Sequence, residues 1–176
     1  MEIVEKPTYL LWSIIIILAA SLVGLYVSGQ SKQQKVITEL QSKAGQTYIA
    51  NIPAQLAANT NYRKVLFTGT RSQLVIMDIP PGGDVGEEVH KYVEQTLFFY
   101  SGTGKAILDG KERSIGPGDV VVVTPGTKHN FVNTGTSSLQ IFTVYAPPNH
   151  LPGTLEATKA VADQNVADET YGEAYR

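Results

Sequence analysis

The chain has 176 residues, contains no cysteine and carries a formal net charge of -2 at pH 7. Without cysteine it has no disulfide, no thiolate metal site and no cysteine nucleophile. Charged residues make up 17% of the chain and form no long basic run, which excludes the surface that nucleic acid binding requires. The length beyond the first few dozen residues suits one domain of ordinary size.

The first element is an apolar run without a charged residue, residues 9–27. Its length matches the ~20 residues that cross the hydrocarbon core of a bilayer. Tyr9 and Trp12 stand at one end and Tyr26 at the other, where aromatic side chains favour the membrane interface. A buried core helix would show a polar face. The run therefore predicts a transmembrane helix over residues 9–28, after a short N-terminal tail, residues 1–8.

A cleaved signal peptide is the main alternative to a retained anchor. Signal peptides have a basic N-terminal region and a shorter apolar core, whereas here Glu2 and Glu5 accompany Lys6. We therefore expect a single-pass anchor that stays in contact with the lipid bilayer. Lysines are more frequent after the span than before it, which favours the cytoplasmic side for the following domain. The lysines after the span are Lys32, Lys35 and Lys43.

The segments on either side of the central domain are polar. Residues 29–47 are interpreted as a stalk or linker. Within it, residues 31–43 place Val36, Ile37 and Leu40 on one face of a helix, with a solvated spacer as the alternative. Residues 151–176 are interpreted as a polar C-terminal tail with no assigned function, in which a short helix over residues 154–166 is an option.

The central residues, 48–150, consist of short β runs separated by turns. Asp109-Gly110 predicts a type I′ hairpin turn, and Gly116-Pro117-Gly118-Asp119 marks a second turn. No long helix separates the runs, so the pattern favours an antiparallel barrel or sandwich over a parallel sheet. The predicted strands are residues 65–68, 73–78, 95–101, 105–108, 113–115, 120–123, 130–133 and 139–145.

Two motifs in this region resemble those of the cupin superfamily. Glu88-Val89-His90, followed by Gln95 and Gly102, resembles the first cupin motif, in which two metal ligands stand one residue apart and a carboxylate and a glycine follow. The segment from Gly118 to His129, ending at Asn133, resembles the second. The resemblance covers residues 49–159 and implies a mainly β fold, an antiparallel cupin (jelly-roll) barrel preceded by the transmembrane helix.

The end of the resemblance, Tyr145-Ala146-Pro147-Pro148-Asn149-His150, looks like the end of small single-domain cupins described as mannose-6-phosphate isomerase-like. The chain departs from the family pattern at three positions. Glu88 replaces the usual first histidine, Gln95 replaces the usual glutamate, and Thr124 stands where proline is common.

The motif spacing and strand geometry together predict a metal site. Side chains alternate across a strand, so Glu88 and His90 point to one side, which would be the barrel interior. The resemblance adds Gln95 and His129 as ligands. Buried polar groups need partners, and a cation supplies one to all four. We expect one divalent metal ion, Mn, Fe, Zn or Ni, held by Glu88, His90, Gln95 and His129.

Each of these residues has a structural alternative. The two histidines would otherwise be core residues bonded to backbone, and Glu88 a solvent-facing residue beside Glu87. Glu94 is the rival of Gln95, but strand parity and the spacing to Gly102 favour Gln95. His150 is interpreted as a loop residue rather than a fifth ligand. Three further residues either line the mouth of the barrel or simply pack: Arg63, Tyr92 and Tyr145.

The ligand set with a divalent cation keeps a net charge near +1, which suits an anionic or chelating small molecule. Glutamine is a weak neutral donor, which favours Lewis-acid chemistry on a small polar metabolite, sugar-like or an oxoacid, of the isomerase or lyase type. Two histidines and one carboxylate also match iron dioxygenase sites, which is the first alternative. The second is a non-catalytic module that binds a ligand or metal, or a structural part of a membrane assembly. An enzyme is favoured. The resemblance also implies a homodimer, with Phe98 outward on its strand as a contact residue.

Overall fold

The computed structural model describes residues 20–21, 23–24, 26–29, 31 and 47–174. The chain divides into two compact units, residues 1–42 and 43–176. Among the residues described, no helix combines the length and the apolar character needed to span a bilayer. The anchor predicted over residues 9–28 and the stalk helix predicted over residues 31–43 lie largely outside these residues and stay predictions.

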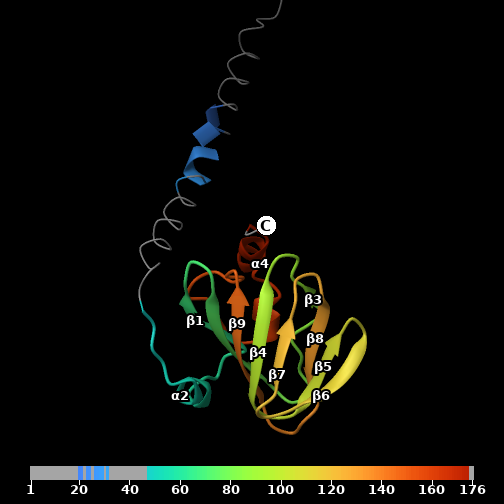
Figure 1. Cartoon of the computed structure of the whole chain (residues 1–176). Helices are drawn as coiled ribbons and strands as arrows, with labels where there is room; N and C mark the ends of the chain where they lie inside the picture. The colour runs from blue at the N-terminus through green and yellow to red at the C-terminus, as the bar shows by residue number, and fades with distance from the viewer. Residues whose placement is uncertain (1–19, 22, 25, 30, 32–46, 175–176) are drawn as a thin grey trace, which may run out of the picture. The chain divides into compact units, whose positions relative to one another are not determined.

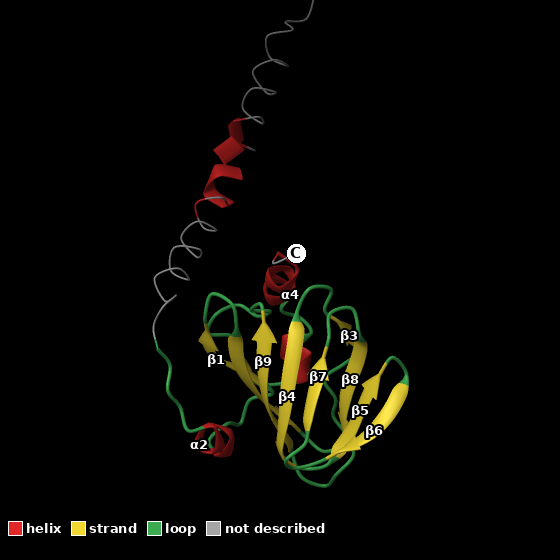
Figure 2. Cartoon of the chain, viewed as in Figure 1, coloured by secondary structure: helices red, strands yellow, loops and turns green. Residues whose placement is uncertain are grey.

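The second unit is mainly β, as predicted, with three short helices (Figures 1 and 2). The helices are α2 (Ile52–Ala57), α3 (Lys159–Ala162) and α4 (Val166–Ala174). The strands are β1 (Arg63–Thr68), β2 (Gln73–Ile79), β3 (Glu88–Val89), β4 (Glu94–Ser101), β5 (Gly104–Leu108), β6 (Lys111–Ile115), β7 (Val120–Val123), β8 (Lys128–Asn133), β9 (Leu139–Ala146) and β10 (Leu155–Glu156).

The strands form two antiparallel sheets. One has six strands in the order β10-β1-β2-β9-β4-β7, and the other has four in the order β3-β8-β5-β6. The neighbours in each sheet are mostly far apart in sequence, which is the connectivity expected of a jelly roll rather than of successive hairpins. Asp109 and Gly110 both have positive φ, 48° and 75°, as the type I′ turn between β5 and β6 requires.

The core lies between the two sheets. In β4 the buried and exposed side chains alternate, with Gln95, Leu97 and Phe99 buried and Phe98 and Tyr100 exposed. The Phe99 ring contacts that of Phe131 from the other sheet at a centroid distance of 5.6 Å. Strand parity therefore places Gln95 inward and Phe98 outward, as the sequence predicted.

The polar C-terminal segment differs from the expected tail. Its strand β10 pairs with β1, with Arg63 opposite Glu156, and so forms the edge of the six-stranded sheet. Thr158 caps α3 through its side chain, which accepts a hydrogen bond from the Val161 N–H. Figure 1 shows α4 at the end of the unit where β9 finishes. The segment is therefore part of the folded unit. Its strand β10 pairs with β1, which is far from it in the sequence.

Gly102, the glycine of the first motif, sits at a close approach between chain segments. Its φ is +79°, and a Cβ there would overlap the Ser138 carbonyl and lie 2.8 Å from Leu139 Cα. Both the left-handed backbone and the lack of space require glycine. The motif glycine thus closes the turn between β4 and β5.

Candidate metal centre

The centre begins with a pair of residues on neighbouring strands. Glu88 on β3 stands opposite His129 on β8 in the ladder, and His90 follows two residues after Glu88. The His90 Nε2 lies 3.3 Å from Glu88 Oε2, and the His129 Nε2 lies 3.9 Å from the same oxygen. One ligand atom from each of these residues falls within 4.8 Å of the others. The first and second motifs therefore meet at one point.

The short strand β3 is held in register by the residues before it. The Val85 N–H donates to the Phe131 carbonyl at 3.0 Å, and the Gly86 N–H donates to Asn130 Oδ1 at 3.0 Å. Asn130 Nδ2 in turn donates to Asp84 Oδ2 at 3.0 Å. These bonds fix the approach to β3 and so fix which face Glu88 takes.

His129 has one nitrogen committed to the backbone. Its Nδ1 lies 2.9 Å from the Thr127 carbonyl, which can only accept, so Nδ1 carries the proton. The side chain is fully buried, and burial lowers the pKa of His129 below its ordinary value, against the Thr127 carbonyl, which acts to raise it. The neutral imidazole thus presents an Nε2 lone pair to the site, the form that binds metals.

Glu88 supplies the negative charge of the centre. Burial acts to raise the pKa of its carboxyl group, but the His90 imidazole and the Arg63 guanidinium lower it below its ordinary value. Its side chain is 30% exposed, compared with 0% for His129. The carboxylate is therefore ionised and stands at the open side of the site.

Gln95 comes to the same region from the other sheet. It is 1% exposed and lies opposite Tyr145 in the β4–β9 ladder. The Tyr145 ring in turn packs edge-on against the His90 ring, at a centroid distance of 5.9 Å. Residues opposite one another in an antiparallel pair point to the same face, so Gln95 and Tyr145 both point inward. Glu94, the alternative, is exposed on the outer face.

Three donor atoms of this centre lack a hydrogen-bond partner in the part of the chain that the structure describes. Among the described residues, the buried atoms without a hydrogen bond include His90 Nε2, His129 Nε2 and Gln95 Oε1. Buried polar atoms are nearly always bonded, and leaving one unbonded costs about 1–3 kcal/mol. A cation would satisfy the two lone pairs and the amide oxygen beside the carboxylate, so the residues present fit a divalent metal ion.

A cavity of about 420 Å³ opens beside this centre. Glu88 and His90 line it on one side, and Arg63, His150 and Asp168 line it on the other. Tyr92 lies at its rim and is 48% exposed. The cavity is large enough for a small organic molecule, and Glu88 and His90 on its wall leave one side of the candidate centre accessible.

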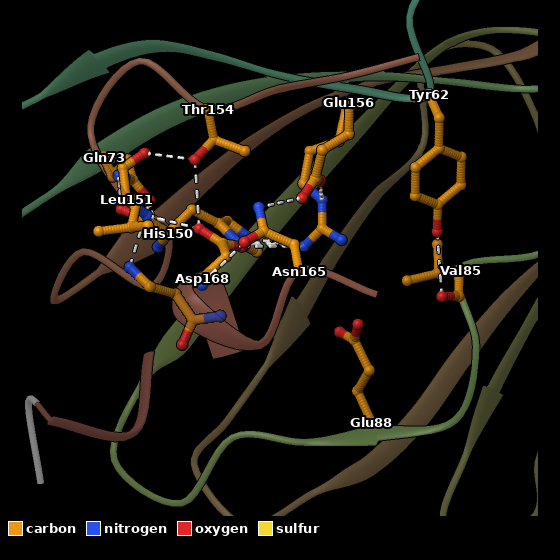
Figure 3. A network of polar contacts seen from close by, with 12 residues as sticks. Tyr62, Gln73, Val85, Glu88, His150, Leu151, Thr154, Glu156, Asn165 and Asp168 are labelled. Atoms are coloured by element: carbon orange, nitrogen blue, oxygen red, sulfur yellow. Dashed lines mark hydrogen bonds and ion pairs between the residues drawn. The ribbon is translucent and has the colours of Figure 1, made fainter. Parts of the chain in front are cut away.

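Two residues in the cavity go beyond the sequence interpretation. His150, read as a loop residue, is 4% exposed and lies 2.7 Å through Nδ1 from Asp168 Oδ2 on α4. Asp168 was not singled out at all. Figure 3 shows the two in a network with Glu156 and Asn165, and the Glu88 carboxylate pointing toward it. The tail has no motif or strong periodicity, so no signal in the sequence would have indicated Asp168.

The comparisons with known proteins agree with this architecture. Residues 75–145 match the family described as the Cupin domain. The uncharacterized protein YrkC of Bacillus subtilis is 36% identical over 122 residues, 65% of each chain, so this chain spans slightly less than two thirds of that relative. An uncharacterized protein of Acanthamoeba polyphaga mimivirus is 31% identical over 123 residues, 67% of this chain and 76% of that protein.

A solved structure extends the similarity to three dimensions. The crystal structure of BH2720 from Bacillus halodurans has a TM-score of 0.66 at 30% identity, and the match covers 68% of this chain and 95% of that one. The family match, residues 75–145, includes the strands that carry the two motifs. With its jelly-roll sheets and both motifs joined at one centre, the chain belongs to the cupin family.

Proposed function

We propose that the protein binds one divalent metal ion through Glu88, His90, Gln95 and His129 and acts as a metal-dependent enzyme on a small polar metabolite. One observation carries the proposal: among the described residues, the Nε2 atoms of His90 and His129 and the Oε1 of Gln95 are buried without a hydrogen bond, and His90 lines the same cavity as Glu88. The reaction class we favour is isomerisation or lysis of a sugar-like compound or an oxoacid. The metal is Mn, Fe, Zn or Ni.

The residues present support Lewis-acid chemistry. A bound divalent ion would polarise a substrate carbonyl or hydroxyl group. Glu88 contributes the single negative charge among the four donors, while His129 stays neutral and oriented by the Thr127 carbonyl. Glu94 is exposed and does not line the cavity, so it does not fit the role of a proton carrier. We assign no catalytic acid or base.

Two observations bear on the alternatives. Catalytic metal sites keep an open position facing a pocket, whereas structural ones are closed by protein. The cavity beside Glu88 and His90 therefore supports a catalytic or ligand-binding role over a purely structural one. The group of two histidines and one carboxylate also supports the iron dioxygenase alternative. Oxygen consumption with the iron-loaded protein separates the two chemistries, because isomerases and lyases of this kind need no oxygen.

Metal analysis of the purified full chain tests the proposal. We expect about one metal ion per chain in the wild type and a loss of it in the His90→Ala/His129→Ala variant. His150→Ala is the matched control, since His150 is the remaining histidine of the chain and contacts Asp168 instead of the centre. If the wild type and the double variant held the same trace of metal, the metal-centre proposal would be wrong.

We also propose that residues 9–28 anchor the protein in a membrane with the cupin domain on the cytoplasmic side, and that the domain forms a homodimer. The uncharged apolar run and the lysines that follow it support the anchor and its orientation. Resistance of the full chain to alkaline extraction from membranes, with the C-terminus shielded from external protease, is the expected result. Release into the soluble fraction would contradict it.

A further inference from the structure

The cavity that reaches the candidate metal centre contains one buried guanidinium, that of Arg63 on β1. Its side chain is 11% exposed, and it lines the cavity together with Glu88, His90 and His150. A buried arginine needs a defined partner for each of its donors, because an unpaired charge is costly away from water. The protein partners of Arg63 contact only some of its guanidinium nitrogens.

Two of the three nitrogens of Arg63 are in contact with the protein. Its Nε lies 2.8 Å from Glu156 Oε2, and its Nη1 lies 3.0 Å and 3.2 Å from the two ring nitrogens of His150. Nη1 is also 3.9 Å from Asp168 Oδ2. Within the part of the chain that the structure describes, no hydrogen bond or ion pair involves Nη2. Nη2, with its two N–H groups, is thus without a protein partner among the described residues, on a side chain that lines the cavity.

The partners of Arg63 are themselves fixed. His150 donates from Nδ1 to Asp168 Oδ2 at 2.7 Å, which leaves Nε2 to accept from Arg63 Nη1. Asp168 also accepts from the Leu151 N–H at 2.6 Å, and Glu156 accepts from Asn165 Nδ2 at 2.9 Å. The guanidinium is therefore held from two sides in one orientation. Such preorganisation reduces the loss of freedom when a ligand binds.

The charge around the cavity favours an anion that carries a single negative charge. The cavity lining carries five carboxylates, those of Glu87, Glu88, Asp163, Asp168 and Glu169, against two basic residues, Arg63 and Lys91. Lys91 Nζ lies 4.9 Å from the centroid of the Tyr92 ring, and a phosphate dianion would still face this excess of negative charge. A carboxylate carries one charge and fits the two N–H groups of Nη2. The surroundings favour a carboxylate over a phosphate.

We propose that Arg63 binds a carboxylate of the substrate through Nη2, while the other end of the same molecule reaches the metal centre. The substrate is then a small hydroxy or oxo acid with a second carboxylate. This inference rests on the metal-dependent function proposed above and names its substrate class. It adds Arg63 as a binding residue and gives β10 and α4 a role, since they carry Glu156 and Asp168.

A homologous series of 2-hydroxy dicarboxylic acids tests two things together: the distance between the metal centre and Arg63, and the need for a negative charge on the distal group. The probes are tartronate, malate and 2-hydroxyglutarate, each compared with its distal amide by titration calorimetry of the metal-loaded wild-type chain. We expect at least one acid to bind about tenfold or more tightly than its amide, as a charged hydrogen bond provides. Equal affinities for every acid and its amide would overturn the inference. Tighter binding of 3-phosphoglycerate than of malate would overturn the choice of carboxylate.

The Arg63→Gln variant tests the residue itself. It should lose the preference for the acid over the amide while keeping its metal content and its affinity for glycolate, which lacks the distal group. Lys91→Gln is the matched control, because Lys91 is an exposed lysine on the same cavity wall. An unchanged preference in Arg63→Gln, or an equal loss in Lys91→Gln, contradicts the inference. If Arg63→Gln does not fold, Arg63→Gln/Glu156→Gln removes both charges of the pair and carries the same expectation.

Metal content measured on the same samples distinguishes a failure of the proposed metal site from a failure of the proposed role of Arg63. A wild-type chain that binds no metal would overturn the proposed function and this inference with it. A chain that binds metal and glycolate but gains nothing from a distal carboxylate would leave the proposed function standing and overturn the role of Arg63.

Discussion

Glu88 and His129 are cross-strand neighbours, paired in the ladder between β3 and β8. Because β3 has only two residues, the centre depends on the register of a very short strand. A shift by one residue would turn Glu88 to the opposite face and bring Val89 or Glu87 in its place. The bonds of Val85 and Gly86 to β8 are therefore as important for the centre as the ligands themselves.

Replacing Gln95 with glutamate restores the residue that the family pattern usually has and tests whether this position faces the metal. In the metal-free protein, Gln95→Glu buries a second carboxylate near Glu88, and we expect a loss of roughly 3 kcal/mol in the free energy of unfolding. With saturating metal the two charges are compensated, so the variant should gain more stability from metal than the wild type does. Urea denaturation with chelator and with metal measures both.

Glu94→Gln is the control for this experiment, since Glu94 is the exposed neighbour on the same strand. It should change stability little in either condition. If Gln95→Glu responded to metal no more than Glu94→Gln, Gln95 would not belong to the centre, and the site would consist of Glu88, His90 and His129 alone.

The close approach at Gly102 predicts a large loss of stability on adding one methyl group. Gly102→Ala combines the left-handed backbone, which costs about 1–2 kcal/mol, with an overlap on Ser138 and Leu139 that adds about 1–3 kcal/mol. Gly110→Ala is the matched control, because Gly110 has φ +75° but no atom within 4 Å of a built Cβ. Thermal or chemical denaturation should rank Gly102→Ala well below Gly110→Ala. Equal losses would show that the backbone at Gly102 relaxes away from the overlap.

Local pattern was enough to predict most of the fold. The alternation of side chains in β4 predicted that Gln95 points inward, and the Asp109-Gly110 pair predicted the hairpin turn. Both predictions depend only on residues close in sequence. The motif spacing predicted that Glu88, His90 and His129 lie close together, because the cupin fold pairs the strands that carry the two motifs. The strands β3 and β10, of two residues each, were too short to leave a periodic signal.

The far side of the cavity was not predictable in the same way. Arg63, His150 and Asp168 come from three distant segments, and each is a single polar residue in an otherwise ordinary context. Their contacts exist only because the C-terminal segment folds back along β1, where Arg63 pairs with Glu156. No local propensity encodes that return, so the sequence predicts only a polar tail without an assigned function over residues 151–176.

The outer face of β4 and β7 is the surface on which we expect the homodimer to form. Phe98 stands opposite Val120 on β7 and Phe142 on β9 and stacks on Phe142 at 5.7 Å. Phe98 is 43% exposed and Val120 53%, beside a strand edge that has no neighbour among the described strands. Contiguous apolar surface of this kind is typical of a contact region. Phe98→Lys should shift the protein toward the monomer in sedimentation velocity.

Leu155→Lys provides the control for the dimer test. Leu155 is 59% exposed on β10, at the opposite edge of the same sheet, so its replacement adds the same charge away from the expected contact. A monomeric wild type, or equal dissociation by both variants, would contradict a dimer through β4 and β7.

The buried pair of His150 and Asp168 predicts a pH dependence of stability. Burial lowers the pKa of His150, and the Arg63 guanidinium acts in the same direction against Asp168. In the unfolded chain the imidazole takes up a proton below about pH 6.5, whereas in the folded chain it stays neutral to lower pH. The unfolded state then binds more protons, so the free energy of unfolding falls as pH falls below about 6.5.

His150→Asn removes this titration while keeping a donor near the position of Nδ1. Between about pH 6 and 5 its free energy of unfolding should fall less steeply than that of the wild type, by up to about 1.4 kcal/mol per pH unit. Burial acts to raise the pKa of Asp168, but its hydrogen bonds lower it. Asparagine at position 150 keeps a donor for this carboxylate and the Leu151 N–H still donates to it, so in both proteins Asp168 affects stability below about pH 5 and leaves this window clear. His129 titrates in both proteins and cancels in the difference. Parallel slopes in urea denaturation across this range would mean that His150 is protonated in the folded protein, and Nη1 of Arg63 would then lack its acceptor.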